Sequence, residues 1–445
     1  IDTLHEAGRH NDALEWVQQT RARFKNEIGG TLALFAQLRI HMAQSNWPAV
    51  VRDAEDLSKF SDLGGTRVPG GTNPAEVNFL RAYALEQMGR TEEAVAGYLS
   101  IPDGRNEYYG MRATQRLLAL GSQDKSRSIV QMQLNSLLSQ MKSEQHEPAR
   151  VAAQSALRLT NDPKTRVEIL ERLKVAYEAL PAYRLPQCNA ALLLRTQRIP
   201  SSQDPPSRSD ALFALELLDE AVPEFLATRG SIDPRSDDAC MIAFLSLKAE
   251  LPNRAIRFAE PLWKTMPADY VIELAPSGLI TFLYPAPFRD SLSKHATSRN
   301  VDPRFVLAIA RQESRFQVDA KSIAAARGMM QFIPATANQI AGELKLTNFD
   351  QDDLYNADTA ILFGSQYLSN LFKLFPNQPQ AVAGAYNGGE DNLARWIARS
   401  RSTEADRYVP EIGFSQTKDY VYKVLANYWN YQRLYTDGLV HISQK

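Results

Sequence analysis

One carboxylate in the chain stands where a general acid could act. This is Glu313, near the end of a helix predicted over residues 302–316. Apolar residues recur at helical spacing at Val306, Ile309 and Ala310, and Glu313 follows Ile309 by four positions on the same face. Burial penalises a charged carboxylate, so we expect the pKa of Glu313 to be raised, which suits a general acid. The alternative is a buried glutamate paired with a distant arginine or a backbone amide, because structural networks also bury carboxylates.

The start of this helix is well marked in the sequence. Asp302 can accept hydrogen bonds from the first amides, and Pro303 suits the first helical position, where its missing N–H would have no partner. Arg311 and Arg315 each lie two positions from Glu313, and residues two apart point to different sides of a helix. We therefore expect neither arginine to be the local partner of the carboxylate.

Length and composition limit the classes of fold and function that the chain can have. A chain of 445 residues predicts two or more domains, and 44% hydrophobic and 23% charged residues are typical of a globular protein. With 50 basic and 51 acidic residues, the formal net charge of −1 gives no electrostatic reason to expect nucleic acid as a partner. No apolar run is long enough to span a bilayer. We expect no metal and no cofactor.

The two cysteines, Cys188 and Cys240, form no cluster of the metal-binding type. A disulfide between them could form in an oxidising compartment, but the interpretation we favour is two small buried hydrophobic side chains. The chain starts at Ile1 inside a helical pattern. We interpret it as a mature or trimmed chain whose targeting segment has been removed.

Residues 1–290 are predicted to be helical almost throughout. A polar turn followed by a helix that opens with a small residue recurs loosely at residues 7–14, 45–50, 88–95 and 250–256. This pattern is similar to tetratricopeptide-type hairpins, in which an alanine at the crossing lets two helices approach closely. The spacing is uneven, which predicts an irregular helical solenoid. Such a surface could bind a long polymer or a protein partner, or the solenoid could be a rigid spacer; the sequence favours neither.

Prolines separate this part from the rest of the chain. The Tyr-Pro-Ala-Pro-Phe segment at residues 284–288 cannot continue a regular helix, so we place a domain boundary near residue 290. The predicted domains are thus a solenoid with its linker over residues 1–290 and a second, mostly helical domain over residues 291–445. In the second domain we expect an extended segment at 329–333 and helices over the following ranges: 357–375, 379–386, 389–399 and 417–434.

Three motifs in the second domain occur in one order and register. They are Glu-Ser-x-Phe at 313–316, Gly-x-Met-Gln-x-x-Pro-x-Thr-Ala at 328–337 and Ala-Tyr-Asn-x-Gly at 385–389. Together they resemble the motif set of the soluble lytic transglycosylases, and a weaker piece at 412–421 resembles the C-terminal motif of that family. The resemblance implies an all-α protein in which a helical solenoid precedes a lysozyme-like catalytic domain. It also implies a lyase that cuts peptidoglycan between N-acetylmuramic acid and N-acetylglucosamine and leaves 1,6-anhydro ends.

The resemblance assigns roles to individual residues. It implies that Glu313 is the single catalytic acid and then base. Two-carboxylate glycosidases need a second acid at a defined distance, and no second acidic residue falls within a matching motif. The residues that the resemblance places around the substrate or in the walls of its cleft are Phe316, Ser322, Met330, Gln331, Tyr386, Asn387, Gln416 and Tyr420. Ser314 is expected to satisfy the local backbone instead.

The sequence departs from the family pattern at several positions. Ala325 stands where the family usually has Gly, and in the C-terminal motif Gly413 replaces Pro and Gln416 replaces Glu. The change at Gln416 removes a charge from near the expected cleft, so any contact made by that glutamate is in doubt.

Two alternatives remain at this point. One is a hydrolytic muramidase with the same acid, in which water replaces the internal hydroxyl. The other is a weakly active cell-wall-binding module with the solenoid as a scaffold for a protein partner. In each case we expect peptidoglycan glycan strands as the ligand and a periplasmic or cell-envelope location. The sequence leaves open the oligomeric state and whether the enzyme is exo- or endo-acting.

Overall fold

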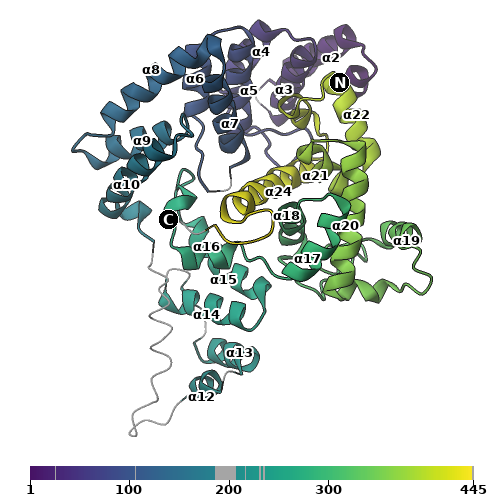
Figure 1. The fold of residues 1–445 in the computed structure, drawn as a ribbon. Helices are drawn as coiled ribbons and strands as arrows, with labels where there is room; N and C mark the ends of the chain where they lie inside the picture. Colours follow the sequence, from purple (N-terminus) through teal and green to yellow (C-terminus); the bar gives the residue numbers. More distant parts are fainter. Residues whose placement is uncertain are drawn as a thin grey trace. The chain divides into compact units, whose positions relative to one another are not determined.

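Helices dominate the structure, a computed structural model that describes residues 1–25, 27–105, 107–185, 207–215, 217–229, 232–233 and 236–442 (Figure 1). Across these ranges helices are the only extended regular elements, and β-structure is limited to isolated bridges such as that between Arg327 and Phe332. The predicted all-α fold is confirmed. Most of the proline-rich segment predicted as a loop at 199–207 lies outside the described residues. None of the described helices is both long and apolar enough to cross a membrane.

The chain divides into two compact units. Unit 1 comprises residues 1–179 and 370–426, and unit 2 comprises residues 180–369 and 427–445. Each unit therefore combines segments that are distant in the sequence. The predicted division near residue 290 rests on motifs and prolines, does not coincide with these units, and stays a prediction.

Unit 1 begins with a succession of helices in which each packs against the next from α1 to α10. These helices are α1 (Asp2–Glu6), α2 (His10–Arg23), α3 (Ile28–Ala43), α4 (Trp47–Leu57), α5 (Pro74–Gln87), α6 (Thr91–Leu99), α7 (Tyr108–Ser122), α8 (Asp124–Gln140), α9 (His146–Leu157) and α10 (Pro163–Ala179). Its second segment contains α21 (Pro379–Gly388), α22 (Glu390–Ser400), α23 (Ala405–Tyr408) and the 3₁₀ turn η5 (Val409–Glu411).

Unit 2 contains shorter helices and the helix that carries Glu313. These are η1 (Pro181–Tyr183), α12 (Arg208–Ala214), α13 (Leu218–Arg229), α14 (Asp237–Lys248), α15 (Pro252–Lys264), η2 (Ile272–Leu274), α16 (Ser277–Leu283), α17 (Arg289–His295), η3 (Thr297–Arg299), α18 (Pro303–Ser314), α19 (Pro334–Glu343) and η4 (Gln351–Tyr355). Two long helices, α20 (Ala357–Leu374) and α24 (Ser415–Leu434), contribute residues to both units.

The small residues of the loose repeat in unit 1 are buried. Ala13, Ala49 and Ala94 are all buried in unit 1. At Gly97 of α6 a Cβ atom would stand 2.9 Å from the Cβ of Ala82 in α5, so these two helices approach as closely as their backbones allow. The expected role of the repeat alanines at helix crossings stays a prediction, and their burial agrees with it.

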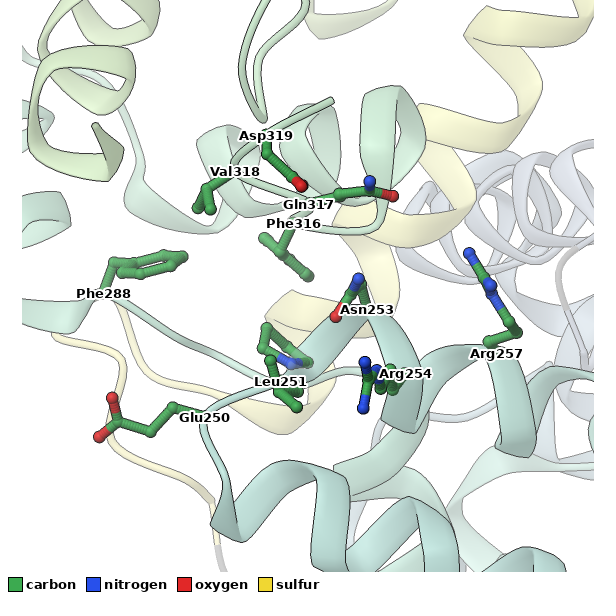
Figure 2. Close-up of a pocket in the computed structure, with 11 residues that line it drawn as sticks. Glu250, Leu251, Asn253, Arg254, Arg257, Phe288, Phe316, Gln317, Val318 and Asp319 are labelled. Carbon is green, nitrogen blue, oxygen red and sulfur yellow. The ribbon is translucent and has the colours of Figure 1, made fainter. Parts of the chain in front are cut away.

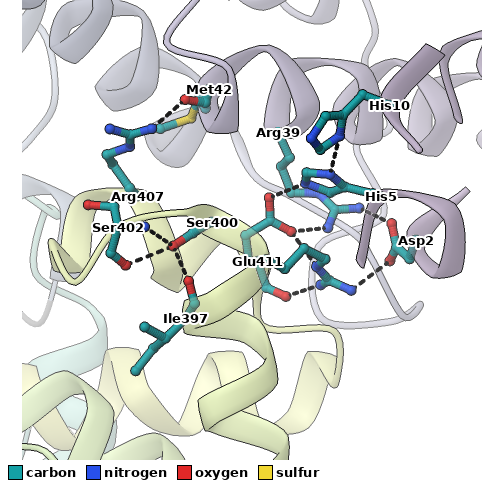
Figure 3. A network of polar contacts seen from close by, with 11 residues as sticks. Asp2, His5, His10, Arg39, Met42, Ile397, Ser400, Ser402, Arg407 and Glu411 are labelled. Carbon is teal, nitrogen blue, oxygen red and sulfur yellow. Dashed lines mark hydrogen bonds and ion pairs between the residues drawn. The ribbon is translucent and has the colours of Figure 1, made fainter. Parts of the chain in front are cut away.

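A buried ionic network ties the second segment of unit 1 to its first helices (Figure 3). The Glu411 carboxylate lies 2.8 Å from Nη1 of Arg39, 2.7 Å from Nε of Arg399 and 3.1 Å from Nε2 of His5. Burial by itself raises the pKa of Glu411, but the charges of Arg39 and Arg399 and the hydrogen bond with His5 outweigh burial and hold the pKa well below its usual range.

A second ionic contact lies at the start of α24. The Nζ atom of Lys418 donates to the Glu76 carboxylate of α5 over 2.7 Å, and both side chains are buried. The hydroxyl of Tyr109 donates to the other oxygen of Glu76 over 2.8 Å. Buried charges that are paired and hydrogen-bonded in this way make the packing of α24 on α5 and α7 specific within unit 1.

The interpretation of the cysteines that we favoured is wrong for Cys240. This residue of α14 is disulfide-bonded, so it is not a free hydrophobic side chain in the core. Cys188 lies outside the described residues. The physical reason for the error is that burial and disulfide formation leave the same local sequence signal, a cysteine among apolar neighbours.

The predicted helices of the second domain are confirmed closely by α20, α21, α22 and α24, which begin and end within two residues of expectation. The predicted extended segment at 329–333 is wrong. Residues 328–331 form a tight turn, closed by paired backbone hydrogen bonds between Arg327 and Phe332 at 3.0 and 3.2 Å. The turn depends on positive φ angles at Gly328 and Gln331, which a run of apolar residues does not reveal.

Candidate active site

Glu313 lies in the last turn of α18, whose start follows the sequence signals. The Asp302 carboxylate accepts from the Arg304 amide over 2.9 Å, and Pro303 occupies the first helical position. The helix ends where Arg315 and Phe316 adopt left-handed φ angles of 54° and 67°. Glu313 is half-buried.

The helix is enclosed on more than the one face that we predicted. Phe305, Val306, Leu307, Ala308 and Ile309 are consecutive and at most 1% exposed. The middle of α18 is therefore enclosed, whereas Gln312, Glu313 and Ser314 in its last turn are half-buried. A helix fixed in this way gives the carboxylate near its end a defined position.

Arg311 and Arg315, the cationic neighbours of Glu313 in sequence, share another carboxylate. Glu260 of α15 accepts from Arg311 over 3.2 Å and from Arg315 over 2.9 Å. Arg311 also donates to the carbonyl oxygen of Leu283 over 2.8 Å and to Asn427 Oδ1 over 3.0 Å. The prediction that neither arginine is the local partner of Glu313 stays a prediction.

Sequence reasoning missed Glu260 as a residue that positions α18. It lies 51 and 55 positions from the two arginines, so no local spacing connects them. The guanidinium of Arg311 also lies over the Tyr284 ring at 4.7 Å, which joins the proline-rich linker to the same helix.

The residues that follow α18 fold into a compact loop over 320–332. The Oγ atom of Ser322 accepts from the Ala326 amide over 3.0 Å, and the Ser322 amide donates to the Ala326 carbonyl over 3.0 Å. Ser322 thus closes the tip of the loop with its own side chain. Its expected contact with substrate stays a prediction.

Gln331 closes the other end of this loop. Its Nε2 atom donates to the carbonyl oxygens of Gly328 and Ala320 over 2.9 and 3.3 Å. Gly328 is required here, since its φ is +73° and a Cβ atom would stand 2.0 Å from the carbonyl oxygen of Leu354. The Gln331 side chain therefore fixes the loop through its amide nitrogen.

Met330 and Phe316 are buried residues. Met330 is fully buried against α20, where a Cβ added at Gly364 would meet the Met330 Cε at 2.4 Å. Phe316 is 2% exposed and lies immediately beyond α18. These buried side chains pack beside the loop over 320–332 and the end of α18. Their predicted role in shaping the cleft stays a prediction.

Ser314 behaves as expected from the sequence. Its Oγ atom donates to the Met329 carbonyl over 2.9 Å and accepts from the Gln317 amide over 3.0 Å. The residue next to Glu313 thus joins α18 to the loop that contains Gln331. The prediction that Ser314 satisfies the local backbone is confirmed.

Ala325 stands at a position that favours glycine. Its φ is +60°, in the left-handed region where a Cβ atom is strained. This positive φ explains why glycine would suit this place in the loop.

The remaining predicted residues belong to unit 1, where α21 meets α24. Asn387 is exposed and its Oδ1 accepts from Thr417 Oγ1 over 2.8 Å, while Tyr386 is half-buried at the end of α21. In α24, Gln416 is exposed and Tyr420 is 6% exposed. The structure therefore brings the third and fourth motifs together within unit 1 and brings Glu313 and the loop together within unit 2.

A cavity of about 510 Å³ lies beside the end of α18 (Figure 2). Phe316, Gln317, Val318 and Asp319 line it from the segment after Glu313. From the other side, Phe288 of the linker lines the cavity. The remaining lining residues come from the turn before α15 and from its first turns, namely Glu250, Leu251, Pro252, Asn253, Arg254 and Arg257. No motif in the sequence indicated this cavity.

Comparison with known proteins finds similarity within the C-terminal part of the chain. Residues 290–409 match the family model of the transglycosylase SLT domain. A Haemophilus influenzae protein provisionally named a soluble lytic murein transglycosylase is 32% identical over 173 residues, which cover 39% of this chain and 29% of that protein. The soluble lytic murein transglycosylase of Escherichia coli K12 is 30% identical over 145 residues, which cover 32% of this chain and 22% of the relative.

These matches span less than a third of the length of the curated relatives. Among solved structures, the lytic transglycosylase Slt of Pseudomonas aeruginosa, determined as an inactive mutant, is 19% identical with a TM-score of 0.43. That alignment covers 97% of this chain and 72% of the other. Residues 290–409 are thus similar to the transglycosylase SLT domain, and the resemblance to the soluble lytic transglycosylases that the motifs indicated is confirmed.

Proposed function

We propose that this protein is a lytic transglycosylase that cleaves the glycan strands of peptidoglycan. The observation that carries the proposal is the match of residues 290–409 to the transglycosylase SLT domain, with Glu313 intact at the end of the enclosed helix α18. The Haemophilus influenzae and Escherichia coli relatives are both named as soluble lytic murein transglycosylases. We further propose residues 291–445 as the catalytic domain and residues 1–290 as the solenoid, a division that the extent of the family match supports.

In the first step, the Glu313 carboxylic acid donates its proton to the glycosidic oxygen. The bond between C1 of N-acetylmuramic acid and this oxygen breaks, and the leaving sugar departs as an alcohol. The N-acetyl carbonyl oxygen of the same muramic acid stabilises the positive charge at C1. This internal assistance removes the need for a second protein carboxylate.

In the second step, the Glu313 carboxylate takes the proton of the 6-hydroxyl group as O6 forms a bond to C1. The 1,6-anhydro ring closes, the carboxylic acid is regenerated, and no water is consumed. The attacking hydroxyl belongs to the same sugar, so its effective concentration at C1 far exceeds that of an external nucleophile. One residue acts first as acid and then as base.

Hydrogen bonds in the structure support a positioning role for residues of the loop over 320–332. Ser314 holds the end of α18 to the loop, and Gln331 and Ser322 keep the loop in one conformation through hydrogen bonds of 2.9 and 3.0 Å. A loop held in this way can present polar atoms to a sugar without reorganisation. We propose that Tyr386, Asn387, Gln416 and Tyr420 contribute further contacts with the glycan.

We propose a periplasmic or cell-envelope location, since this is where peptidoglycan is found. The disulfide at Cys240 supports it, because disulfides persist in oxidising compartments and are rare in the cytosol.

Product analysis tests the reaction type. The full chain is incubated with purified sacculi in water enriched in ¹⁸O, and the soluble muropeptides are analysed by mass spectrometry. A lytic transglycosylase releases products that are lighter by one water per cut than hydrolysis products, and they carry no ¹⁸O. Products with reducing ends that carry ¹⁸O would instead identify a hydrolytic muramidase.

A further inference from the structure

The carboxylate of Glu76 is enclosed and hydrogen-bonded at both oxygens. This residue lies in the first turn of α5 and is 0% exposed. Its Oε2 atom accepts from Lys418 Nζ and from Thr72 Oγ1, each over 2.7 Å, and its Oε1 atom accepts from the Tyr109 hydroxyl over 2.8 Å. The positive end of the α5 helix dipole also favours the charged carboxylate. Glu76 is thus a fixed anion that holds the ammonium group of Lys418 at one defined point.

Other groups of unit 1 enclose the Lys418 side chain as well. Its Nζ atom lies 4.8 Å from the centroid of the Phe35 ring of α3 and donates to the Gly71 carbonyl oxygen over 3.4 Å. Gly71 belongs to the glycine-rich loop between α4 and α5. A buried ion pair adds little net stability, because both charges lose their hydration, but its hydrogen bonds fix the distance between the elements that it joins. The start of α24 is therefore located by α3, by α5 and by this loop.

Thr417, the residue before Lys418, connects the start of α24 to the end of α21. It is 3% exposed, and its Oγ1 atom donates to Asn387 Oδ1 over 2.8 Å, whereas Asn387 itself is exposed. A Cβ atom at Gly388 would stand 2.9 Å from the Thr417 Cγ2 atom, so the two helices meet without spare room. A shift at the start of α24 therefore moves the Asn387 side chain.

We infer that Glu76 and Lys418 are positioning residues for the glycan contact of Asn387, and that they act through Thr417. This inference rests on the proposed function, since that function makes Asn387 a contact of the glycan. A side chain held in place before substrate arrives binds it without a further ordering cost. The ion pair joins positions that are 342 apart in the sequence, so α5 in the first part of the chain takes part in substrate binding and is more than a rigid spacer.

Steady-state cleavage of glycan strands by the full chain tests this inference. The double variant Glu76→Gln with Lys418→Met removes both charges, so no unpaired charge is left buried and the fold is kept. We expect KM to rise about tenfold, as for one lost hydrogen bond, while kcat stays within about twofold. A purely structural role would instead reduce the folded fraction, which lowers kcat and leaves KM unchanged, and that result would overturn the inference. The control is Lys423→Met, at an exposed lysine of α24, which should leave KM unchanged.

Variants of Thr417 test whether the ion pair acts through this residue. Thr417→Val removes the hydroxyl and keeps the shape of the side chain, so KM should rise as in the double variant. The triple variant should show no further rise, because residues that act through one shared contact are not additive. Thr417→Ser keeps the hydroxyl and should hold KM within about twofold of the unmodified chain. Fully additive increases in KM would overturn the inference.

A resonance measurement tests the positioning without any need for catalysis. The full chain is labelled with ¹⁵N-asparagine, and the side-chain amide signal of Asn387 is identified by its loss in Asn387→Asp. The double variant and Thr417→Val should move this signal in the same direction, and Lys423→Met should leave it in place. An unmoved signal in the double variant overturns the inference whether or not the chain cleaves peptidoglycan. Absence of cleavage by the unmodified chain contradicts the proposed function and leaves this signal to decide whether Glu76 and Lys418 position Asn387.

Discussion

The Nη2 atom of Arg311 lies 3.2 Å from the Oε1 atom of Glu260, and this contact joins the helix that carries Glu313 to α15. The Arg311 side chain is 7% exposed and that of Glu260 is 17% exposed. Glu260 also pairs with Arg315, so one carboxylate compensates two cations around the end of α18. The position of Glu313 therefore depends on a residue outside every recognised motif.

Replacement of this carboxylate tests its role. Glu260→Gln leaves the buried Arg311 charge without compensation, so we expect the free energy of unfolding to fall by about 2 to 3 kcal/mol. Urea denaturation followed by circular dichroism measures it. Glu220→Gln, at an exposed glutamate of α13, is the control and should change stability by less than about 0.5 kcal/mol. Equal stability of the two variants would show that Glu260 does not hold α18.

The contact of Gly328 with Leu354 gives a second prediction. A Cβ atom at residue 328 would stand 2.0 Å from a carbonyl oxygen and would strain the positive φ. We expect Gly328→Ala to lower the free energy of unfolding by about 3 kcal/mol and to reduce cleavage of peptidoglycan, because the loop that holds Gln331 must shift.

The control for this variant is a glycine with open space around it. At Gly342 of α19, no atom lies within 4 Å of an added Cβ. Gly342→Ala should leave activity unchanged and alter stability by no more than about 1 kcal/mol, in the stabilising direction. Normal activity in Gly328→Ala would mean that the loop conformation does not matter for catalysis.

The strained Ala325 predicts a stabilising substitution. Ala325→Gly removes the Cβ atom from a left-handed conformation, a gain of about 1 to 2 kcal/mol that exceeds the entropy cost of glycine, so we expect a net gain of about 0.5 to 1 kcal/mol. Thermal unfolding monitored by calorimetry measures the change in Tm. The neighbouring Ala326→Gly, at a buried residue whose φ is not positive, should lower Tm. If both substitutions lower Tm, the strain at Ala325 is absent.

The lowered pKa of Glu411 predicts how stability depends on pH. Burial alone raises this pKa, but Arg39, His5 and Arg399 together lower it below the value of about 4.3 expected in the unfolded chain. The stabilisation is complete above the unfolded-state pKa and is lost as the pH falls through it towards the folded-state pKa. We therefore expect the free energy of unfolding to decrease as the pH falls below about 5.

The variant Glu411→Gln should be less stable at neutral pH by about 3 kcal/mol and should show a shallower decrease in acid. The control is Glu92→Gln, at an exposed glutamate of α6, which should follow the pH profile of the unmodified chain. Urea titrations at a series of pH values compare the three proteins. Parallel profiles for all three would rule out Glu411 as the source of the acid sensitivity.

Local signals in the sequence were sufficient to predict the bounds of several helices. Asp302 and Pro303 marked the start of α18 because capping depends on neighbouring residues only. The bounds of α20, α21, α22 and α24 followed from periodicity and from prolines in the same way. The motifs also indicated the family of residues 290–409.

Features that depend on tertiary contacts were not predictable. The turn at Gly328 and Gln331 requires close approach to Leu354, and the partner of Arg311 lies 51 positions away. The disulfide at Cys240 depends on spatial pairing that one sequence cannot give. Burial around α18 on several sides could not be inferred from its pattern either, because the number of neighbours is a property of the fold.

The cavity beside α18 was missed for a related reason. Its lining combines the start of α15, the linker and the segment after Glu313, which are separated in the sequence by up to 69 positions from Glu250 to Asp319. None of these three segments indicates a cavity by itself. Only the packing within unit 2 brings Arg254 and Arg257 to the end of α18.

The central claim is that Glu313 alone supplies the acid and the base. The most direct test measures the initial rate at which 1,6-anhydro-muropeptides are released from purified sacculi, by mass spectrometry, for Glu313→Gln and for Glu390→Gln. Glu390 is a half-buried carboxylate at the start of α22 and serves as the matched control. The account predicts that Glu313→Gln lowers the rate by at least about a thousandfold while its circular dichroism spectrum is unchanged, and that Glu390→Gln stays within about twofold of the unmodified chain. Full release of anhydro products by a folded Glu313→Gln variant would contradict it.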